Sequence, residues 1–259
     1  MKVPILLPNI FNHPFTYESD LNLKVGDYVV VPFGKSKITG VVWDEFEKKN
    51  KKNFKVKNIL KKLNVEPLKK TTIKFLNWFS EYNIIPKGMA LKLVLLSSNA
   101  VEKLSKDTYK NFNFNIKSNS IKLSEEQKKS LKKMNNSNNS FRVHVLQGTT
   151  GSGKTIVYFE ALKDIINKGF QGLILLPEIG LTGQFEKKFV EFFGFPPAIW
   201  HSGISNKKKK IIWSGISTGE IKVVIGARSS LFLPFKKLGL IIVDEEHDQS
   251  FKQDEGVIY

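Results

Sequence analysis

The 259-residue sequence lacks cysteine, has only two arginines, and contains no long apolar run. Without cysteine the chain can form neither a disulfide nor a thiolate metal site. A membrane-spanning helix needs about 20 consecutive apolar residues, and the N-terminus is too short and too interrupted by proline for a signal peptide. These absences exclude disulfide-stapled and membrane-spanning proteins, and they favour a cytoplasmic protein with no membrane partner.

Lysine, in contrast, is present in excess. The 41 Lys and Arg residues outnumber the 24 Asp and Glu residues, which gives a formal net charge of +17 at pH 7. Such a charge suits a polyanionic partner such as nucleic acid. Because a lysine-rich composition also leaves many lysines merely solvated, the charge alone does not decide between these two interpretations.

The length suffices for two domains, and residues 1–97 are predicted to form the first. Short apolar runs separated by turns predict strands at 25–33, 38–43 and 56–60, as in a small β barrel or sandwich. The apolar period becomes helical over 71–96. The apolar face of that segment is expected to lie in the core rather than to stack on bases, and its members are Ile73, Leu76, Trp78, Phe79 and Tyr82.

Residues 98–120, rich in Ser, Asn and Lys, predict a linker, and residues 121–259 predict an α/β domain. Ser124 is expected to cap a helix, with Gln127 three residues later as in a capping box. From residue 141 onward, strand-length apolar runs alternate with helical periods, which indicates a doubly wound parallel sheet. The strands are expected at 141–147, 172–176, 198–200, 221–225 and 238–243, and the helices at 156–166, 181–193 and 205–218.

The clearest functional motif reads G-x-x-x-x-G-K-T and lies between a predicted strand and a predicted helix, as a phosphate-binding loop does. Backbone N–H groups in such a loop close around nucleotide phosphates, and the helix N-terminus adds a positive dipole end. Lys154 can reach the β- and γ-phosphates, and the Thr155 hydroxyl can ligate Mg²⁺. The predicted ATP-binding loop consists of Gly148, Thr149, Thr150, Gly151, Ser152, Gly153, Lys154 and Thr155.

An acidic pair, Asp244-Glu245, follows the apolar strand predicted at 238–243. A Mg²⁺-nucleotide site needs one carboxylate to hold the metal and a second one to polarise the attacking water. We therefore expect Asp244 to hold magnesium together with Thr155, and Glu245 to act as the general base. Lys154, Asp244 and Glu245 form the predicted catalytic set.

Several blocks of sequence together resemble the PriA family of replication-restart helicases. They are Gly148–Thr155, Leu175–Thr182, Gly226–Phe232, and Val243–Asp248 followed by Ser250–Gln253. The resemblance implies a RecA-like first motor lobe, with Gln127 as an adenine-sensing residue and His247 coupling the metal site to DNA. It also implies that DNA contacts come from Pro177, Glu178, Thr182, Arg228 and Phe251. Phe251 and Tyr259 fall in the stretch that couples DNA binding to hydrolysis in the family. For Arg228, bracing of the loop is an equal alternative to a phosphate contact.

The N-terminal part is similar to the family's domain that holds a DNA 3′ end. The matching positions, implied to bind DNA, are Phe15, Thr16, Tyr17, Gly34 and Lys57. Thr16 stands where the family often has an acidic residue, and Phe15 and Tyr17 could equally belong to a barrel core. The family's winged-helix module has no room in residues 98–120.

The resemblance implies an ATP-dependent 3′-to-5′ DNA helicase that binds forked or single-stranded DNA at a 3′ end. It also implies work in replication restart with other primosome proteins and single-strand-binding protein. The family's second motor lobe, with its arginine finger and zinc-binding cysteines, would follow Tyr259. Zinc is thus expected only there, and this chain alone is expected to bind ATP and DNA but to hydrolyse ATP poorly. The alternatives are another DNA or RNA helicase or translocase, and a non-catalytic DNA-binding module.

Overall fold

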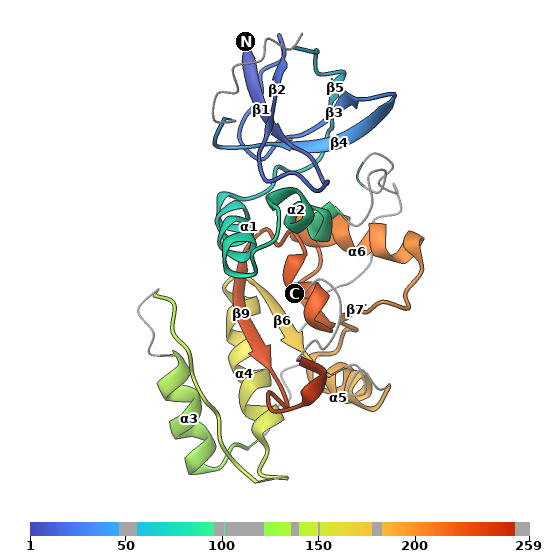
Figure 1. Ribbon diagram of the computed structural model, residues 1–259. Coiled ribbons are helices and arrows are strands. Elements are labelled where there is room, and N and C mark those ends of the chain that lie inside the picture. Colours follow the sequence, from blue (N-terminus) through green and yellow to red (C-terminus); the bar gives the residue numbers. More distant parts are fainter. Residues whose placement is uncertain are drawn as a thin grey trace.

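The computed structural model describes residues 1–46, 56–95, 101, 122–135, 140–149, 151–177 and 183–251. A small antiparallel sheet lies at one end of the molecule, and a parallel sheet with its helices lies at the other (Figure 1). In the described part of the chain, no helix has the length and apolar character that crossing a membrane requires.

The N-terminal sheet has the strand order β2-β1-β4-β3-β5, with antiparallel neighbours throughout. A parallel bridge between Glu18 and Asn58 joins the edge strand β2 to the segment that leads into β5 at the other edge. This bridge favours the barrel over the sandwich. The segment predicted as a strand at 56–60 forms only this bridge. The strands are β1 (Lys2–Leu6), β2 (Phe15–Glu18), β3 (Tyr28–Phe33), β4 (Ser36–Val42) and β5 (Lys61–Lys62).

Both faces of this sheet are buried, because side chains alternate between two apolar layers. One layer fills the inside of the small sheet and contains Val29, Val31 and Ile5. The other contains Tyr28 and Val30 and faces the helices that follow. The barrel therefore cannot present its outer face to water, and it requires a partner layer.

That partner layer is formed by α1 (Lys70–Tyr82) and α2 (Lys87–Leu95). The predicted apolar face of α1 is only partly correct. Ile73, Leu76 and Phe79 are buried as expected, whereas Trp78 is 53% exposed and Tyr82 is 73% exposed. The two exposed rings stack on each other, with centroids 5.2 Å apart, on a second stripe of the helix that faces away from the core.

The second domain is built on a parallel sheet with the order β7-β8-β6-β9. Its central strands are covered on both faces, since Ile174 and Leu173 of β6 belong to two different core clusters. The strands are β6 (Gln171–Leu175), β7 (Ala198–Trp200), β8 (Val223–Gly226) and β9 (Leu238–Val243). The helices are α3 (Glu125–Asn135), α4 (Lys154–Asn167), α5 (Gly183–Phe193) and α6 (Asn206–Thr218), with the short 3-10 helices η2 (Arg228–Phe232) and η3 (Gln249–Phe251).

The strand predicted at 141–147 is wrong, because residues 141–149 form no strand. Phe141, Val143 and Val145 are 92%, 77% and 90% exposed. A strand needs the N–H and C=O groups of a neighbouring strand, and no described strand lies beside this segment. Among the described strands β9 is the edge on this side, although a near-continuously apolar strand is typical of one covered on both faces. Its Ile241 and Val243 are instead 45% and 47% exposed.

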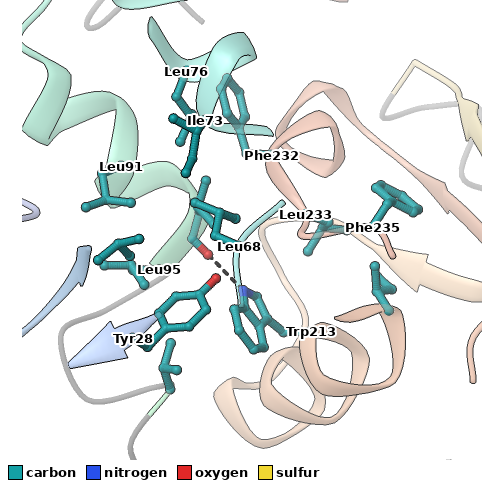
Figure 2. Close-up of a cluster of buried hydrophobic side chains, with 14 of the residues drawn as sticks. Tyr28, Leu68, Ile73, Leu76, Leu91, Leu95, Trp213, Phe232, Leu233 and Phe235 are labelled. Carbon is teal, nitrogen blue, oxygen red and sulfur yellow. Dashed lines mark hydrogen bonds between the residues drawn. The ribbon is translucent and has the colours of Figure 1, made fainter. Parts of the chain in front are cut away.

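The two domains share one hydrophobic core, which runs from the barrel through α1 and α2 into the parallel sheet (Figure 2). The Trp213 side chain of α6 lies at its centre, and its indole N–H donates to the buried carbonyl of Val94 at 2.8 Å. Its ring meets Tyr28 edge-on at 5.7 Å. On the other side of the helical layer, Phe232 packs edge-on against Phe79 at 5.0 Å.

Replacing Trp213 by alanine should destabilise the whole chain by about 3–5 kcal/mol, because it empties the centre of this shared core. The exposed Trp78→Ala variant is the matched control and should change the free energy of unfolding by less than about 0.5 kcal/mol. Urea denaturation followed by far-UV circular dichroism measures both. Two separate transitions, with W213A shifting only one, would contradict a shared core.

Candidate nucleotide and nucleic-acid sites

The glycine loop is placed at the N-terminus of α4, a helix of 14 residues, as the sequence predicts. Gly153 is the N-cap with φ +82°, and Gly151 also has φ +82°, a conformation that residues with a side chain rarely adopt. At Gly148, a Cβ atom would lie 2.5 Å from the Ser152 hydroxyl oxygen. The backbone conformation therefore favours glycine at Gly151 and Gly153, and the N–H groups of the first helical turn of α4 point toward the space in which an anion would bind.

The Lys154 ammonium donates to the carbonyl oxygens of Gly148 at 2.7 Å and Thr149 at 3.2 Å. The half-buried lysine thus lies on its own loop. These two carbonyl contacts are exchangeable, because phosphate oxygens bind an ammonium more strongly than neutral carbonyls do.

Gln127 is brought to the loop by the start of α3. The predicted capping box forms, since Gln127 N–H donates to the Ser124 hydroxyl at 3.3 Å and Ser124 N–H donates to the Gln127 side-chain oxygen at 2.9 Å. The Gln127 amide nitrogen then donates to the carbonyl of Ser152 at 3.0 Å. This contact fits a residue that lies beside the bound nucleotide.

Asp244 and Glu245 follow β9, where the sequence places them. Asp244 N–H continues the sheet by donating to the Leu175 carbonyl at 3.1 Å, and the Asp244 Oδ1 accepts from Glu245 N–H at 3.1 Å. Glu245 has φ +52°, which is uncommon for a residue other than glycine and points to a backbone held by its surroundings. Its exposed carboxylate lies 3.5 Å from the His247 ring.

Tyr158 is a site residue that the sequence-based prediction missed. Its hydroxyl donates to Asp244 Oδ2 at 2.7 Å, and the Thr155 side chain also hydrogen-bonds to the phenol. Burial raises the pKa of the Tyr158 phenol far above its usual value, and the Asp244 carboxylate adds to the rise. The spacing in the sequence contains a signal for this residue. Residues three apart on a helix share a face, so Tyr158 lies on the same face of α4 as the predicted magnesium ligand Thr155.

Thr155 and Asp244 offer a hydroxyl and a carboxylate oxygen, which are the hard ligands that Mg²⁺ takes together with phosphate oxygens. The phenol of Tyr158 contacts both groups and links the loop helix to the end of β9. The residues present therefore fit a Mg²⁺-nucleotide complex. Among the described residues, no cluster of three or more His, Cys, Asp or Glu side chains is suited to another metal.

Arg228 and Phe251, both expected on the DNA side of the lobe, are in contact. The Arg228 guanidinium donates to the Phe251 carbonyl at 3.1 Å, and this bond supports the bracing alternative. Pro177 is buried after β6, so its side chain offers little surface to DNA. The remaining predicted residues Thr150, Glu178, Thr182 and Tyr259 lie outside the described residues.

In the barrel, Phe15 and Tyr17 share one face of β2, and Thr16 points to the other. The Tyr17 ring is only 5% exposed and its hydroxyl donates to the Pro32 carbonyl at 3.2 Å, while burial raises its pKa to about 12. Gly34 follows Phe33, whose ring lies 5.3 Å from Phe15. Lys57 is beside Glu18 at the far end of the strand, so the structure groups Phe15 with Gly34 but not with Lys57.

Two family models match separate parts of the chain. A family model for the PriA 3′ DNA-binding domain (3′BD) matches residues 2–96, and a model for DEAD/DEAH box helicases matches residues 124–258. The replication restart protein PriA of Rickettsia conorii is 42% identical over 98% of this chain and 39% of that protein. PriA of Bacillus subtilis is 38% identical over 62% of this chain and 20% of that protein. The chain thus spans well under half the length of these curated relatives.

Removing only the phenol oxygen, in Tyr158→Phe, should weaken the apparent affinity for Mg²⁺ in nucleotide binding by about 10- to 100-fold, because Asp244 loses the group that orients it. Binding of the nucleotide without Mg²⁺ should not change. Titration of a fluorescent ATP analogue at several Mg²⁺ concentrations measures both quantities. Tyr82→Phe removes an exposed phenol and serves as the control. An unchanged Mg²⁺ dependence in Y158F would refute the linking role.

Proposed function

This chain belongs to the PriA family of replication restart proteins, and we propose that it is the N-terminal part of an ATP-dependent 3′-to-5′ DNA helicase. It binds ATP with Mg²⁺ in the second domain and binds DNA at a 3′ end through the barrel. The domain division at 1–97, 98–120 and 121–259 belongs to this proposal. Work at forks with primosome proteins and single-strand-binding protein is proposed for the whole protein.

One observation carries the nucleotide part of this proposal. Two segments 90 positions apart, one with Lys154 and Thr155 and one with Asp244, meet through a single 2.7 Å hydrogen bond from Tyr158. The end of a parallel strand beside the N-terminus of a glycine-capped helix is the place where open α/β sheets bind phosphates.

Different residues of the chain bind the phosphates, hold the metal and accept the proton during hydrolysis. Backbone N–H groups of the loop bind the phosphates, and the Lys154 ammonium exchanges the carbonyls of its own loop for phosphate oxygens. Thr155 and Asp244 would hold magnesium, which would neutralise negative charge on the phosphates. Tyr158 keeps Asp244 oriented toward Thr155. The exposed Glu245 carboxylate accepts the proton of the attacking water.

One feature supports slow turnover by the chain alone. Residues 141–147, which lead into the glycine loop, have no strand beside them among the described residues. A loop that is not fixed by a sheet cannot hold its donors in a constant position, and transition-state stabilisation depends on such preorganisation. We therefore propose nucleotide binding with little hydrolysis.

The shared core supports a coupled DNA-binding function. Tyr28 of the barrel packs on Trp213 of the second domain at 5.7 Å, so a force on the barrel acts directly on α6. A barrel joined to the lobe in this way is suited to keep a bound DNA end at a constant position relative to the nucleotide site.

In the 259-residue chain, Lys154→Ala should weaken ATP binding by roughly 10- to 100-fold, because a charged hydrogen bond to phosphate is lost. Glu245→Gln should leave the affinity unchanged, because its carboxylate acts only on water. Isothermal titration calorimetry separates the two variants. Equal affinity of wild type and K154A would refute the nucleotide site, and rapid DNA-stimulated phosphate release by the wild type would refute slow turnover.

The barrel should prefer a fork with a free 3′ end to the same fork with a 3′ phosphate. Both affinities should fall with rising salt as phosphate contacts release counterions. Fluorescence anisotropy with the two forks at two salt concentrations gives both results. If the two forks bind equally at each salt concentration, recognition of the 3′ end is not a property of this chain.

A further inference from the structure

Four aromatic side chains form a cluster at one end of the barrel, on the connection between β1 and β2 and at the end of β3. The Phe11 ring lies 5.3 Å from Phe15 and 6.4 Å from Phe33, edge-on in both cases. Phe15 and Phe33 are 5.3 Å apart, and the His13 ring lies 5.0 Å from Phe15. Phe15 and Phe33 pack against the barrel core, whereas Phe11 does not belong to it.

Phe11 is the most exposed ring of this cluster, at 40%. A large apolar side chain that packs only on other partly exposed rings contributes little to the core. Edge-on packing of Phe11 against two neighbours fixes its orientation and leaves ring surface open to solvent. The cluster therefore presents to solvent an aromatic ring whose orientation is fixed.

The loop that carries Phe11 is held by hydrogen bonds on both sides of the ring. Phe11 N–H donates to the Asn9 side chain at 3.0 Å, and the Phe11 carbonyl accepts from Gly88 N–H at 3.1 Å. The Asn12 side chain accepts from Lys87 N–H at 3.0 Å, which pins the loop to the start of α2. At Gly88 a Cβ atom would collide with the Asn9 carbonyl, so the contact requires glycine. Phe11 thus needs no rearrangement before it binds a partner.

The surroundings of the cluster suit a nucleic acid. Gly34, with φ +59° and open space where a Cβ would stand, follows Phe33 in the turn between β3 and β4. Lys35 in this turn is exposed, whereas Lys37 pairs with Pro32 and faces the other side of the sheet from Phe33. Aromatic rings for bases next to cations for phosphates are the combination by which proteins bind single strands.

We propose that Phe11 is a stacking residue for an unpaired base of single-stranded DNA, next to the base at the 3′ end. Phe15 and Phe33 support its ring, and the exposed Lys35 lies in the adjacent turn, where it can contact the phosphates. The inference rests on the proposed binding of a 3′ end by the barrel and extends that site by one nucleotide. It also explains how a barrel whose Tyr17 is buried can hold a strand by stacking.

The test uses the 259-residue chain and a duplex with a three-nucleotide single-stranded 3′ tail. Phe11→Ala should weaken binding by roughly 5- to 100-fold, the range for loss of one base–aromatic stack. Phe11→Leu keeps the apolar bulk without the ring and should show most of the loss. Phe46→Ala removes another exposed phenylalanine, 55% accessible, and should bind as the wild type does. Thermal melting confirms that each variant is folded.

An abasic nucleotide, placed in turn at each tail position, identifies the partner of the ring. Wild type should lose affinity when the second position is abasic, and F11A should lose nothing further there. Equal binding by wild type, F11A and F11L, with free 3′ ends still preferred to blocked ones, would overturn the role of Phe11 and leave the proposed function intact. A loss in F11A that persists in full on the abasic tail would also overturn it. If the wild type does not distinguish free from blocked 3′ ends, both the role of Phe11 and the proposed binding of a 3′ end are overturned.

Discussion

The buried contact between α6 and the helical layer is the interaction on which the rest of this structure depends. Trp213 fills the space behind the outer face of the barrel, and its indole N–H satisfies a carbonyl of α2 that water cannot reach. A buried polar pair of this kind fixes the orientation of the two layers, because any slippage leaves both groups unsatisfied. The barrel and the parallel sheet therefore share one core. The outer face of the barrel is stabilised by a domain that lies more than a hundred residues later in the sequence.

The phosphate loop is governed by a different constraint, which is backbone shape. Its glycines adopt a conformation that other residues avoid, and Gly153 leaves room for the Gln127 amide where a Cβ would lie 2.5 Å from it. The absence of a side chain at Gly153 leaves the Gln127 amide free to reach the Ser152 carbonyl. The adenine-sensing role expected for Gln127 and the capping of α3 therefore depend on the same residue, since its side chain contacts both Ser124 and the loop.

The sequence correctly predicted the features that depend only on interactions between residues close together in the chain. The capping box at Ser124, the helix after the glycine loop and the apolar strand before Asp244 all form, because each depends on a few neighbouring residues. The predictions that failed concern features that depend on contacts between residues far apart in the sequence. Trp78 and Tyr82 match a helical apolar face, but only packing decides which stripe is buried. Residues 141–147 have the composition of a strand, but no strand in the described part of the chain lies beside them. The contact of Tyr158 could not be predicted from local sequence, because its hydrogen-bond partner Asp244 is 86 residues away.

Within the described residues β9 lies at the edge of the parallel sheet, and this has a consequence for how copies of the chain behave toward one another. An apolar edge strand with free backbone groups is a template for pairing with the same strand of another molecule. Exposed Lys236 and Lys237 stand immediately before it, and the chain as a whole carries a net charge of +17. Mutual repulsion therefore keeps the edges apart at low ionic strength, but at physiological salt it reaches only about 8 Å. A polyanion that neutralises the lysines removes this protection as well. The same charge that attracts nucleic acid thus also sets the colloidal stability of the protein.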